Sequence, residues 1–410
     1  MPDTSPAPSN NLDLSAERLA RIPHFFQTYL DQKKLPCMAT LISRAGQIAH
    51  LSVQGVMDWD TAEPIKEDTI YRIYSMTKPI TCVAAMMLFE EGKLRLEHDV
   101  SRYLPEYADV KVWDGGSIED PKLVTPDRPM RVHDLFTHMS GITYGFLFQH
   151  YVDGIYRQEK IGEPIETLRK MVRRIAGLPL VFSPGTRWNY GHSIDVLGAI
   201  VEEVSGQTLD TFFKERIFEP LGMVDTGFFV PEDKLKRFAA CYAKDAASGE
   251  IVKSDGGKDS TKLYKSQPIL LNAGGGLVST LHDYHAFCCM LLNGGTLNGK
   301  RLLSPKTIEF MTENHLPDGK TIIEMGDKTF SEARMEGNGF GLLGSVTTDI
   351  VELCQPGSEG SFAWGGLAST YFWIDPVEQL IGIQMTQLIP SSTYPIRPQF
   401  QQLVYAAIEG

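Results

Sequence analysis

A serine and a lysine three residues apart, Ser75 and Lys78, are the first residues whose types and spacing could perform chemistry. They follow a strand-like run and open an apolar stretch of helical character. Positions i and i+3 of a helix share a face, so the Lys78 amine is expected beside the Ser75 hydroxyl. A serine hydroxyl is a weak nucleophile until a base takes its proton, and a lysine can do so once burial lowers its pKa. The spacing predicts nucleophilic catalysis by Ser75 with Lys78 as its base.

An S-x-x-K match alone is weak, because a chain of 410 residues can contain one by chance. Here the match occurs once, at a strand-to-helix junction. The backbone N–H groups of a first helical turn can stabilise an oxyanion, which favours a functional interpretation. The structural alternative is that Ser75 caps the helix and Lys78 is a solvated side chain.

A tyrosine, Tyr190, stands in a segment over residues 184–193 that begins with a Pro-Gly turn and ends where a helical pattern starts. We expect Tyr190 at the tip of a loop, where functional side chains concentrate. A phenol between two cations could become a phenolate and shuttle protons. The structural alternative is an aromatic side chain packed near Trp188.

Two adjacent glycines, Gly365 and Gly366, lie in a late strand-like run over residues 361–367. Glycines in a strand allow a substrate or another backbone to approach closely, although they can also mark a bulge. The N–H group of Leu367 is predicted to complete an oxyanion hole with that of Ser75.

Strand-like patterns lie near both ends of the chain, and helical patterns fill the middle. Helices are predicted over residues 14–32, 80–89, 132–138, 193–204, 280–292 and 398–408. Strands are predicted over residues 38–44, 47–56, 69–74, 339–347, 361–366, 370–374 and 380–385, with Ala45-Gly46 turning the first hairpin.

This order predicts an α+β fold. Residues 1–98 and 277–410 are expected to form one antiparallel sheet flanked by helices, and residues 99–276 an inserted, mostly helical lobe. Clefts between such parts are common catalytic sites, so the active site is expected between them.

The overall composition narrows the function classes. Apolar residues make up 42% of the chain, close to ordinary globular usage. The formal charge is −12, and a surface this acidic repels phosphate groups, so nucleic acid is not an expected partner. No stretch approaches the length of a membrane span, and no signal peptide precedes Leu12, so a cytoplasmic protein is expected. Residues 1–11, rich in Pro, Ser and Asn, are expected to be flexible.

The three motifs together resemble the serine β-lactamase-like superfamily, which includes class C β-lactamases, DD-peptidases, family VIII carboxylesterases and related acyltransferases. Residues 132–141 and 272–277 are also similar to family stretches. The resemblance implies that Ser75 is the nucleophile, Lys78 its base partner and Tyr190 an assisting group. It also implies an α/β sandwich with a helical lobe.

Two departures distinguish this chain within that family. The Y-x-N motif reads Tyr190-Gly191-His192, which places a histidine at the position of a substrate-binding amide. The K-T-G motif has no match, and Trp364-Gly365-Gly366 stands in its place, as in the esterase and acyltransferase branches. Loss of that lysine removes a charge-assisted contact to a substrate carboxylate, worth about 1.5 to 3 kcal/mol.

The function expected from these residues is hydrolysis of small carboxylic esters with short acyl chains through an acyl-enzyme on Ser75. Aromatic residues predicted near the cleft would suit apolar groups; they are Tyr144, Phe146, Phe148 and Trp364. The alternatives are acyl transfer by the same residues, weak β-lactamase or D-peptidase activity, and a non-catalytic binding protein. The state of association, monomer or homo-oligomer, is left open.

Neither a cofactor nor a metal is expected. His282 and His285 share a helical face, but zinc sites usually have a third ligand, and no H-E-x-x-H motif is present. Residues 191–195 fall short of a G-x-S-x-G elbow, and the glycine run 274–276 lacks the Lys of a phosphate-binding loop.

Overall fold

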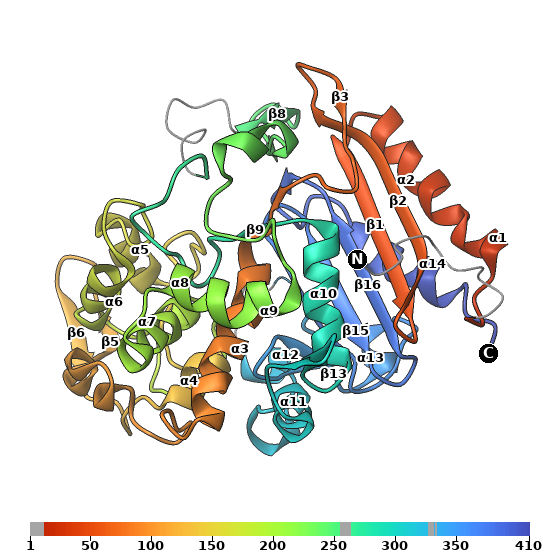
Figure 1. Cartoon of the computed structure of the whole chain (residues 1–410). Helices are drawn as coiled ribbons and strands as arrows, with labels where there is room; N and C mark the ends of the chain where they lie inside the picture. The colour runs from red at the N-terminus through yellow and green to blue at the C-terminus, as the bar shows by residue number, and fades with distance from the viewer. Residues whose placement is uncertain (1–11, 255–263, 327–331, 333) are drawn as a thin grey trace.

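The computed structural model describes residues 12–254, 264–326, 332 and 334–410 (Figure 1). The flexible segment expected over residues 1–11 lies outside the described residues.

The central element is an eight-stranded antiparallel sheet in the described part of the chain, with the order β12-β13-β14-β15-β16-β1-β2-β3. Its strands are β1 (Cys37–Arg44), β2 (Gln47–Asp58), β3 (Glu63–Pro64), β12 (Asn338–Phe340), β13 (Ser345–Thr347), β14 (Phe362–Gly365), β15 (Tyr371–Asp375) and β16 (Leu380–Met385). Both ends of the chain meet where β1 pairs with β16. The predicted antiparallel sheet joined from the two ends is confirmed.

Strand β1 shows why the sheet has a helical layer on each face. Leu41 pairs with Leu51 of β2 and with Ile383 of β16, and both neighbours of β1 are antiparallel. Successive side chains of a strand point to opposite faces, so Leu41 enters one core and Ile42 the other. Ala45 and Gly46 turn the hairpin with φ angles of 48° and 76°, as a two-residue hairpin turn requires.

The helices cover both faces of the sheet, and a helical group lies beside it (Figure 1). On one face lie α1 (Ala16–Leu19), α2 (Arg21–Asp31) and α14 (Ile396–Tyr405), and on the other lies α10 (Leu281–Leu292). Helix α3 (Thr77–Glu90) packs against α7 (Ser193–Ser205). The remaining helices are α4 (Val132–Phe136), α5 (Tyr151–Gln158), α6 (Leu168–Ala176), α8 (Leu209–Phe213), α9 (Glu219–Leu221), α11 (Pro305–Thr312), α12 (Ile322–Met325) and α13 (Ile350–Leu353).

Short strands lie outside the large sheet. They are β4 (Tyr71–Arg72) with β9 (Val278–Ser279), β5 (Val112–Gly116) with β6 (Pro121–Val124), β10 (Thr296–Leu297) with β11 (Lys300–Arg301), and β7 (Tyr242–Lys244) between β8 (Ile251–Lys253) and β17 (Leu388–Ile389). Two strand predictions need correction. The strand expected over residues 69–74 is limited to β4, and that over residues 339–347 is two strands, because the chain turns where Gly341 N–H bonds to the Gly344 carbonyl.

Candidate active site

Ser75 lies in a short 3₁₀ turn, Tyr74–Met76, that leads directly into α3. The preceding residue, Tyr74, has a φ of 43°, a left-handed conformation that is strained for a residue other than glycine. This sharp bend follows β4 and points the chain into the buried helix. Ser75 is 9% exposed, so its hydroxyl is sheltered and still reaches the wall of a cavity. Helix α3 is buried along most of its length, which fixes Ser75 to the core.

Lys78 occupies the first turn of α3 on the same side as Ser75. Its Nζ atom lies 3.2 Å from Ser75 Oγ, as the i, i+3 spacing predicts, and 2.6 Å from the carbonyl oxygen of Gly274. The side chain is buried, and this desolvation lowers the pKa of Lys78 to about 8, although the carboxylates of Asp195 and Glu332 oppose the shift. At pH 7 a group with that pKa is uncharged in about a tenth of the molecules. Lys78 therefore has the position and the basicity of a general base.

Tyr190 packs directly over this pair. Lys78 Nζ lies 4.6 Å from the centre of its ring, and the phenol oxygen receives the indole N–H of Trp364 at 3.4 Å. The segment before α7 is a loop, but it is pinned at Trp188 by a backbone hydrogen bond to Met325, and Tyr190 is only 1% exposed. The expectation of a loop tip is corrected accordingly: Tyr190 lies in the interior.

The phenolate hypothesis for Tyr190 is not supported. Burial raises the pKa of Tyr190 well above its usual value, the nearby carboxylate of Glu332 raises it further, and a hydrogen bond with Ser75 acts in the opposite direction. Tyr190 therefore keeps its proton at neutral pH. A neutral phenol beside Ser75 can donate a proton to a leaving group but cannot serve as a base.

The chain just after β14 brings Leu367, whose N–H group is predicted to bind the oxyanion, to the cavity that Ser75 lines. Leu367 and Ser75 line the same cavity of about 260 Å³. The Leu367 N–H group donates no hydrogen bond within the described part of the chain. The backbone of Ile73 passes so close to Gly366 that a Cβ atom there would lie 2.3 Å from the Ile73 carbonyl oxygen. The glycine therefore permits the close approach that places Leu367 beside Ser75.

The other residues predicted to bind substrate lie behind the cavity wall. Trp364 is 1% exposed and contacts Tyr190 through its indole N–H group, so it positions the phenol. His192 packs against Tyr144 with ring centres 4.3 Å apart, and its Nδ1 atom lies 2.7 Å from Asp195. A Cβ atom at Gly365 would lie 2.5 Å from the guanidinium carbon of Arg397, so this glycine makes room for an arginine rather than for substrate.

The predicted aromatic residues are only partly brought together. Tyr144 and Phe146 stack on each other with ring centres 4.8 Å apart and line the cavity. Phe148 has a 71% exposed side chain at a separate surface hollow. The cavity that Ser75 lines thus has an aromatic part of modest size in its wall.

Asp195, on the first turn of α7, is a site residue that the sequence reasoning missed. It is fully buried, accepts a hydrogen bond from the Gly274 N–H group at 3.0 Å and contacts His192. The carbonyl of Gly274 in turn receives the Lys78 amine, so Asp195 fixes the loop that orients the base. Its spacing of three residues after His192, at the start of an apolar helix, is the signal that could have indicated it.

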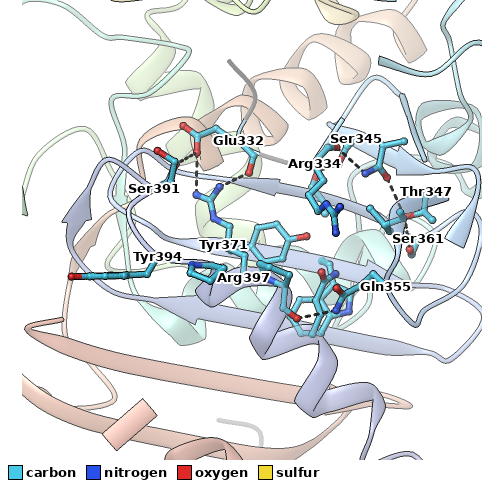
Figure 2. Close-up of a pocket in the computed structure, with 18 residues that line it drawn as sticks. Glu332, Arg334, Ser345, Thr347, Gln355, Ser361, Tyr371, Ser391, Tyr394 and Arg397 are labelled. Atoms are coloured by element: carbon cyan, nitrogen blue, oxygen red, sulfur yellow. Dashed lines mark hydrogen bonds and ion pairs between the residues drawn. The ribbon is translucent and has the colours of Figure 1, made fainter. Parts of the chain in front are cut away.

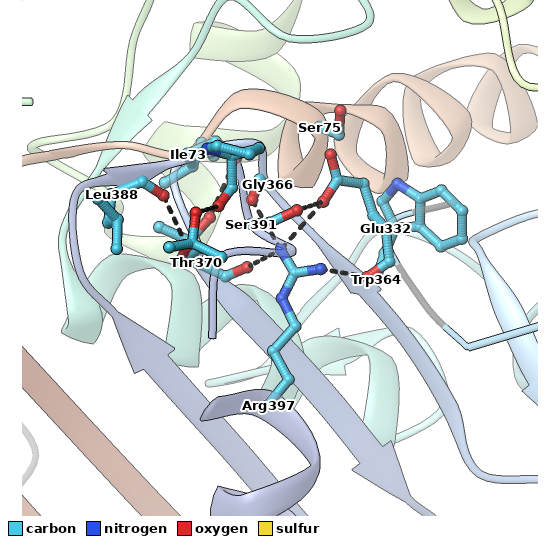
Figure 3. Close-up of polar contacts among 12 residues, drawn as sticks. Ile73, Ser75, Glu332, Trp364, Gly366, Thr370, Leu388, Ser391 and Arg397 are labelled. Atoms are coloured by element: carbon cyan, nitrogen blue, oxygen red, sulfur yellow. Dashed lines mark hydrogen bonds and ion pairs between the residues drawn. The ribbon is translucent and has the colours of Figure 1, made fainter. Parts of the chain in front are cut away.

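Sequence reasoning also missed two further residues near the site, Glu332 and Arg397. Glu332 lines the cavity that contains Ser75 and forms an ion pair with Arg397 of α14 at 3.0 Å (Figure 3). The pair also borders a second cavity of about 290 Å³ on the α14 side of the sheet (Figure 2). Neither residue belongs to a short motif, and Arg397 follows Ser75 by 322 positions in the chain, so local spacing carries no signal for them.

The comparisons with known proteins agree with this architecture. The chain matches the family model described as Beta-lactamase over residues 22–405, and it belongs to that family. The Mycobacterium tuberculosis protein Rv1367c is 36% identical over 86% of this chain and 85% of its own length. Esterase EstB of Burkholderia gladioli is 28% identical over 96% of both chains. The structure of EstCE1, a hydrolase with promiscuous acyltransferase activity, has 25% identity and a TM-score of 0.79 over 96% of this chain and 99% of that chain.

Two further observations concern metals and membranes. His282 contacts Glu67, whereas His285 contacts Ser43 and Cys289, so the two histidines point to different partners. The described residues contain no group of three or more side chains placed to hold a metal ion. Every helix in the described ranges is too short or too polar to cross a bilayer.

Proposed function

We propose that this protein is a serine carboxylesterase that cleaves small esters with short acyl chains through an acyl-enzyme on Ser75. The observation that carries the proposal is the buried Lys78 amine, 3.2 Å from Ser75 Oγ and with a pKa lowered to about 8. The relatives support a hydrolase or acyltransferase, since EstB is named an esterase and EstCE1 a hydrolase with promiscuous acyltransferase activity.

In the proposed acylation step, neutral Lys78 takes the proton of Ser75 as Oγ attacks the ester carbonyl. The N–H groups of Ser75 and Leu367 hold the developing oxyanion, and such donors typically contribute about 10² to 10³ in rate. When the tetrahedral intermediate collapses, the phenol of Tyr190 protonates the leaving alkoxide and recovers a proton from the Lys78 ammonium. Water then attacks the acyl-enzyme while neutral Lys78 takes its proton, and the Lys78 ammonium returns that proton to Ser75 Oγ as the bond between Oγ and the acyl group breaks. No cofactor is needed.

The size and lining of the cavity support the proposed substrate class. Its volume of about 260 Å³ and its wall of Tyr144 and Phe146 suit a small, apolar acyl or alcohol group. The K-T-G lysine of β-lactamases and peptidases is replaced by the Trp364-Gly365-Gly366 sequence. We propose in addition that residues 99–276 form the helical lobe, with Tyr190 and Gly274 facing Ser75 and Leu367 of the sheet-forming part across the cavity.

The same acyl-enzyme supports acyl transfer as a second candidate, which the description of EstCE1 favours. The two activities differ in the acceptor that releases the acyl group. Supplying a primary alcohol during ester turnover and measuring the partition between free acid and new ester separates them. Weak hydrolysis of a cephalosporin would be compatible with either activity, because both use the same acylation residues.

Mass spectrometry of the intact protein after treatment with a fluorophosphonate and with a p-nitrophenyl ester tests the proposal. We expect one adduct, located on Ser75, and none in the Ser75→Ala variant. Ser392→Ala, which changes an exposed serine at the second cavity, is the matched control and should be labelled normally. Unchanged ester turnover by Ser75→Ala would refute the nucleophile, and no turnover or adduct in the wild type would favour a non-catalytic binding protein.

A further inference from the structure

The carboxylate of Glu332 lies in the catalytic cavity but has no part in the proposed proton transfers. Glu332 stands between α12 and β12, outside any regular element, and its side chain is only 1% exposed. It lines the same cavity as Ser75 and Tyr190. Burying a carboxylate costs desolvation free energy unless the charge is paired. The partners of Glu332 therefore indicate which group this part of the cavity binds.

Those partners are a guanidinium and a hydroxyl. Arg397 Nη2 donates to Glu332 Oε2 at 3.0 Å, and Ser391 Oγ donates to the same oxygen at 2.9 Å (Figure 3). Charge-assisted hydrogen bonds of this kind are the strong contacts by which proteins recognise carboxylates. Arg397 and Ser391 line the second cavity, and Glu332 lines both cavities, so the two side chains form a carboxylate-binding arrangement that Glu332 separates from the cavity at Ser75.

The backbone holds the guanidinium of Arg397 independently of the Glu332 carboxylate. Arg397 donates to the carbonyl oxygens of Gly366 at 2.7 Å and Thr370 at 3.0 Å, and also to the main-chain carbonyl of Glu332. Its stem belongs to helix α14, whereas Glu332 itself lies outside any helix or strand. The cation is thus the fixed half of the pair, and the carboxylate is the half that could be replaced.

A negative charge at this position also opposes other anions. The Glu332 carboxylate acts electrostatically on both Lys78 and Tyr190, so its field reaches the centre of the catalytic cavity. A substrate carboxylate entering the cavity would meet this charge in a poorly solvated environment, where like charges repel strongly. An uncharged acyl chain of the same shape would not.

We propose that Arg397 and Ser391 form a carboxylate subsite that the chain fills with its own Glu332, and that this occupation makes the enzyme select esters with uncharged acyl groups. The inference rests on the proposed esterase function and identifies a residue that determines its specificity. A purely structural ion pair would instead affect stability and leave the preference between charged and uncharged substrates unchanged.

The test compares two esters that differ in one charge, p-nitrophenyl valerate and p-nitrophenyl hydrogen glutarate. We expect wild-type enzyme to prefer the valerate, and we expect Glu332→Ala to reduce the ratio of the two kcat/KM values by about tenfold to a hundredfold, the worth of a charge-assisted contact. The substitution also changes the electrostatic environment of Lys78, but this effect applies to both esters and cancels in the ratio of their kcat/KM values. Glu336→Ala is the matched control, because this acid lies in the same segment and has a side chain that is 47% exposed.

The double variant Glu332→Ala/Arg397→Gln should lose the improved relative kcat/KM for the hydrogen glutarate ester, because the cation that binds the carboxylate is removed. Binding of glutarate measured by calorimetry gives a second readout that needs no turnover: Glu332→Ala should bind it at least about tenfold more tightly than wild type. An unchanged ester ratio, or equal glutarate affinities, overturns the subsite. If wild type cleaves neither ester and forms no adduct on Ser75, the esterase proposal fails, and the calorimetry still decides whether the subsite exists.

Discussion

The amine of Lys78 lies closer to a backbone carbonyl than to the nucleophile: Nζ is 2.6 Å from the Gly274 carbonyl oxygen and 3.2 Å from Ser75 Oγ. The Gly274 carbonyl accepts one hydrogen of the Lys78 amine, and this contact orients the amine nitrogen toward Ser75 Oγ. A Cβ atom at Gly274 would lie 3.4 Å from Nζ and 3.1 Å from Asp195, so a glycine keeps this contact close. The base is therefore oriented by the main chain of a loop that Asp195 holds in place.

The first prediction concerns the pH dependence of acylation. Burial lowers the pKa of Lys78 to about 8, and catalysis requires its neutral form, so kcat/KM should rise with pH and level off above about 8. Lys78→Arg keeps the charge but cannot supply a base, and we expect its rate to fall by about 10² to 10⁴. Stopped-flow measurement of p-nitrophenol release gives both results. Lys93→Arg, at a half-exposed lysine, is the control. A flat profile between pH 6 and 9 would contradict this role.

The second prediction separates an acid role for Tyr190 from a base role. Its pKa is raised well above the usual value, so the phenol should protonate the leaving alkoxide. Tyr190→Phe should slow esters of simple alkyl alcohols more than p-nitrophenyl esters, whose leaving group needs no proton. Tyr156→Phe, at a buried tyrosine that does not line the cavity, is the control. Equal losses for both kinds of ester would argue against general acid catalysis by Tyr190.

The contact between Ser75 and Lys78 could be predicted from sequence because it depends on helical periodicity alone. The role of Tyr190 was predicted through the resemblance to a family. Its burial could not be predicted, because the loop is held by contacts with residues far along the chain, such as the Met325 carbonyl that accepts the Trp188 N–H group. Asp195 contacts Gly274 across 79 positions of the chain, so the contact depends on tertiary packing and has no local sequence signal. The two faces of the sheet at β1 could be predicted from sequence, unlike these long-range contacts. The alternation of side chains along one strand and the turn that follows it are local features.

The third prediction tests the effect of the Asp195 charge on the pKa of Lys78. Its carboxylate favours the charged form of Lys78 and thereby raises the pKa of that lysine. Asp195→Asn removes the charge with little change in shape, so the Lys78 pKa should fall and the rising limb of the pH–rate profile should move to lower pH. Asp153→Asn, at another buried acid that hydrogen bonds to Thr143, should leave the limb in place. A shift to higher pH in Asp195→Asn would contradict the assignment.

The last prediction tests the close passage of two chain segments beside the nucleophile. A Cβ atom at Gly366 would lie 2.3 Å from the carbonyl oxygen of Ile73 and 2.3 Å from Thr370 Oγ1, and Ile73 precedes Ser75 by two residues (Figure 3). Gly366→Ala must therefore push β14 away from the turn that carries Ser75. We expect a loss of about 1 to 3 kcal/mol in the free energy of unfolding, as for other overpacked sites.

The displacement should affect catalysis more than folding. Leu367 moves with Gly366, and a misplacement of about 1 Å between reacting groups can cost about 10² in rate. Thermal unfolding and kcat measured on the same preparation separate the two effects. Gly227→Ala is the matched control, because its nearest atom would be 3.7 Å from the added Cβ. If Gly366→Ala binds and turns over ester like wild type, the Leu367 N–H group does not hold the oxyanion, because the geometry that aims it at Ser75 would have changed without consequence.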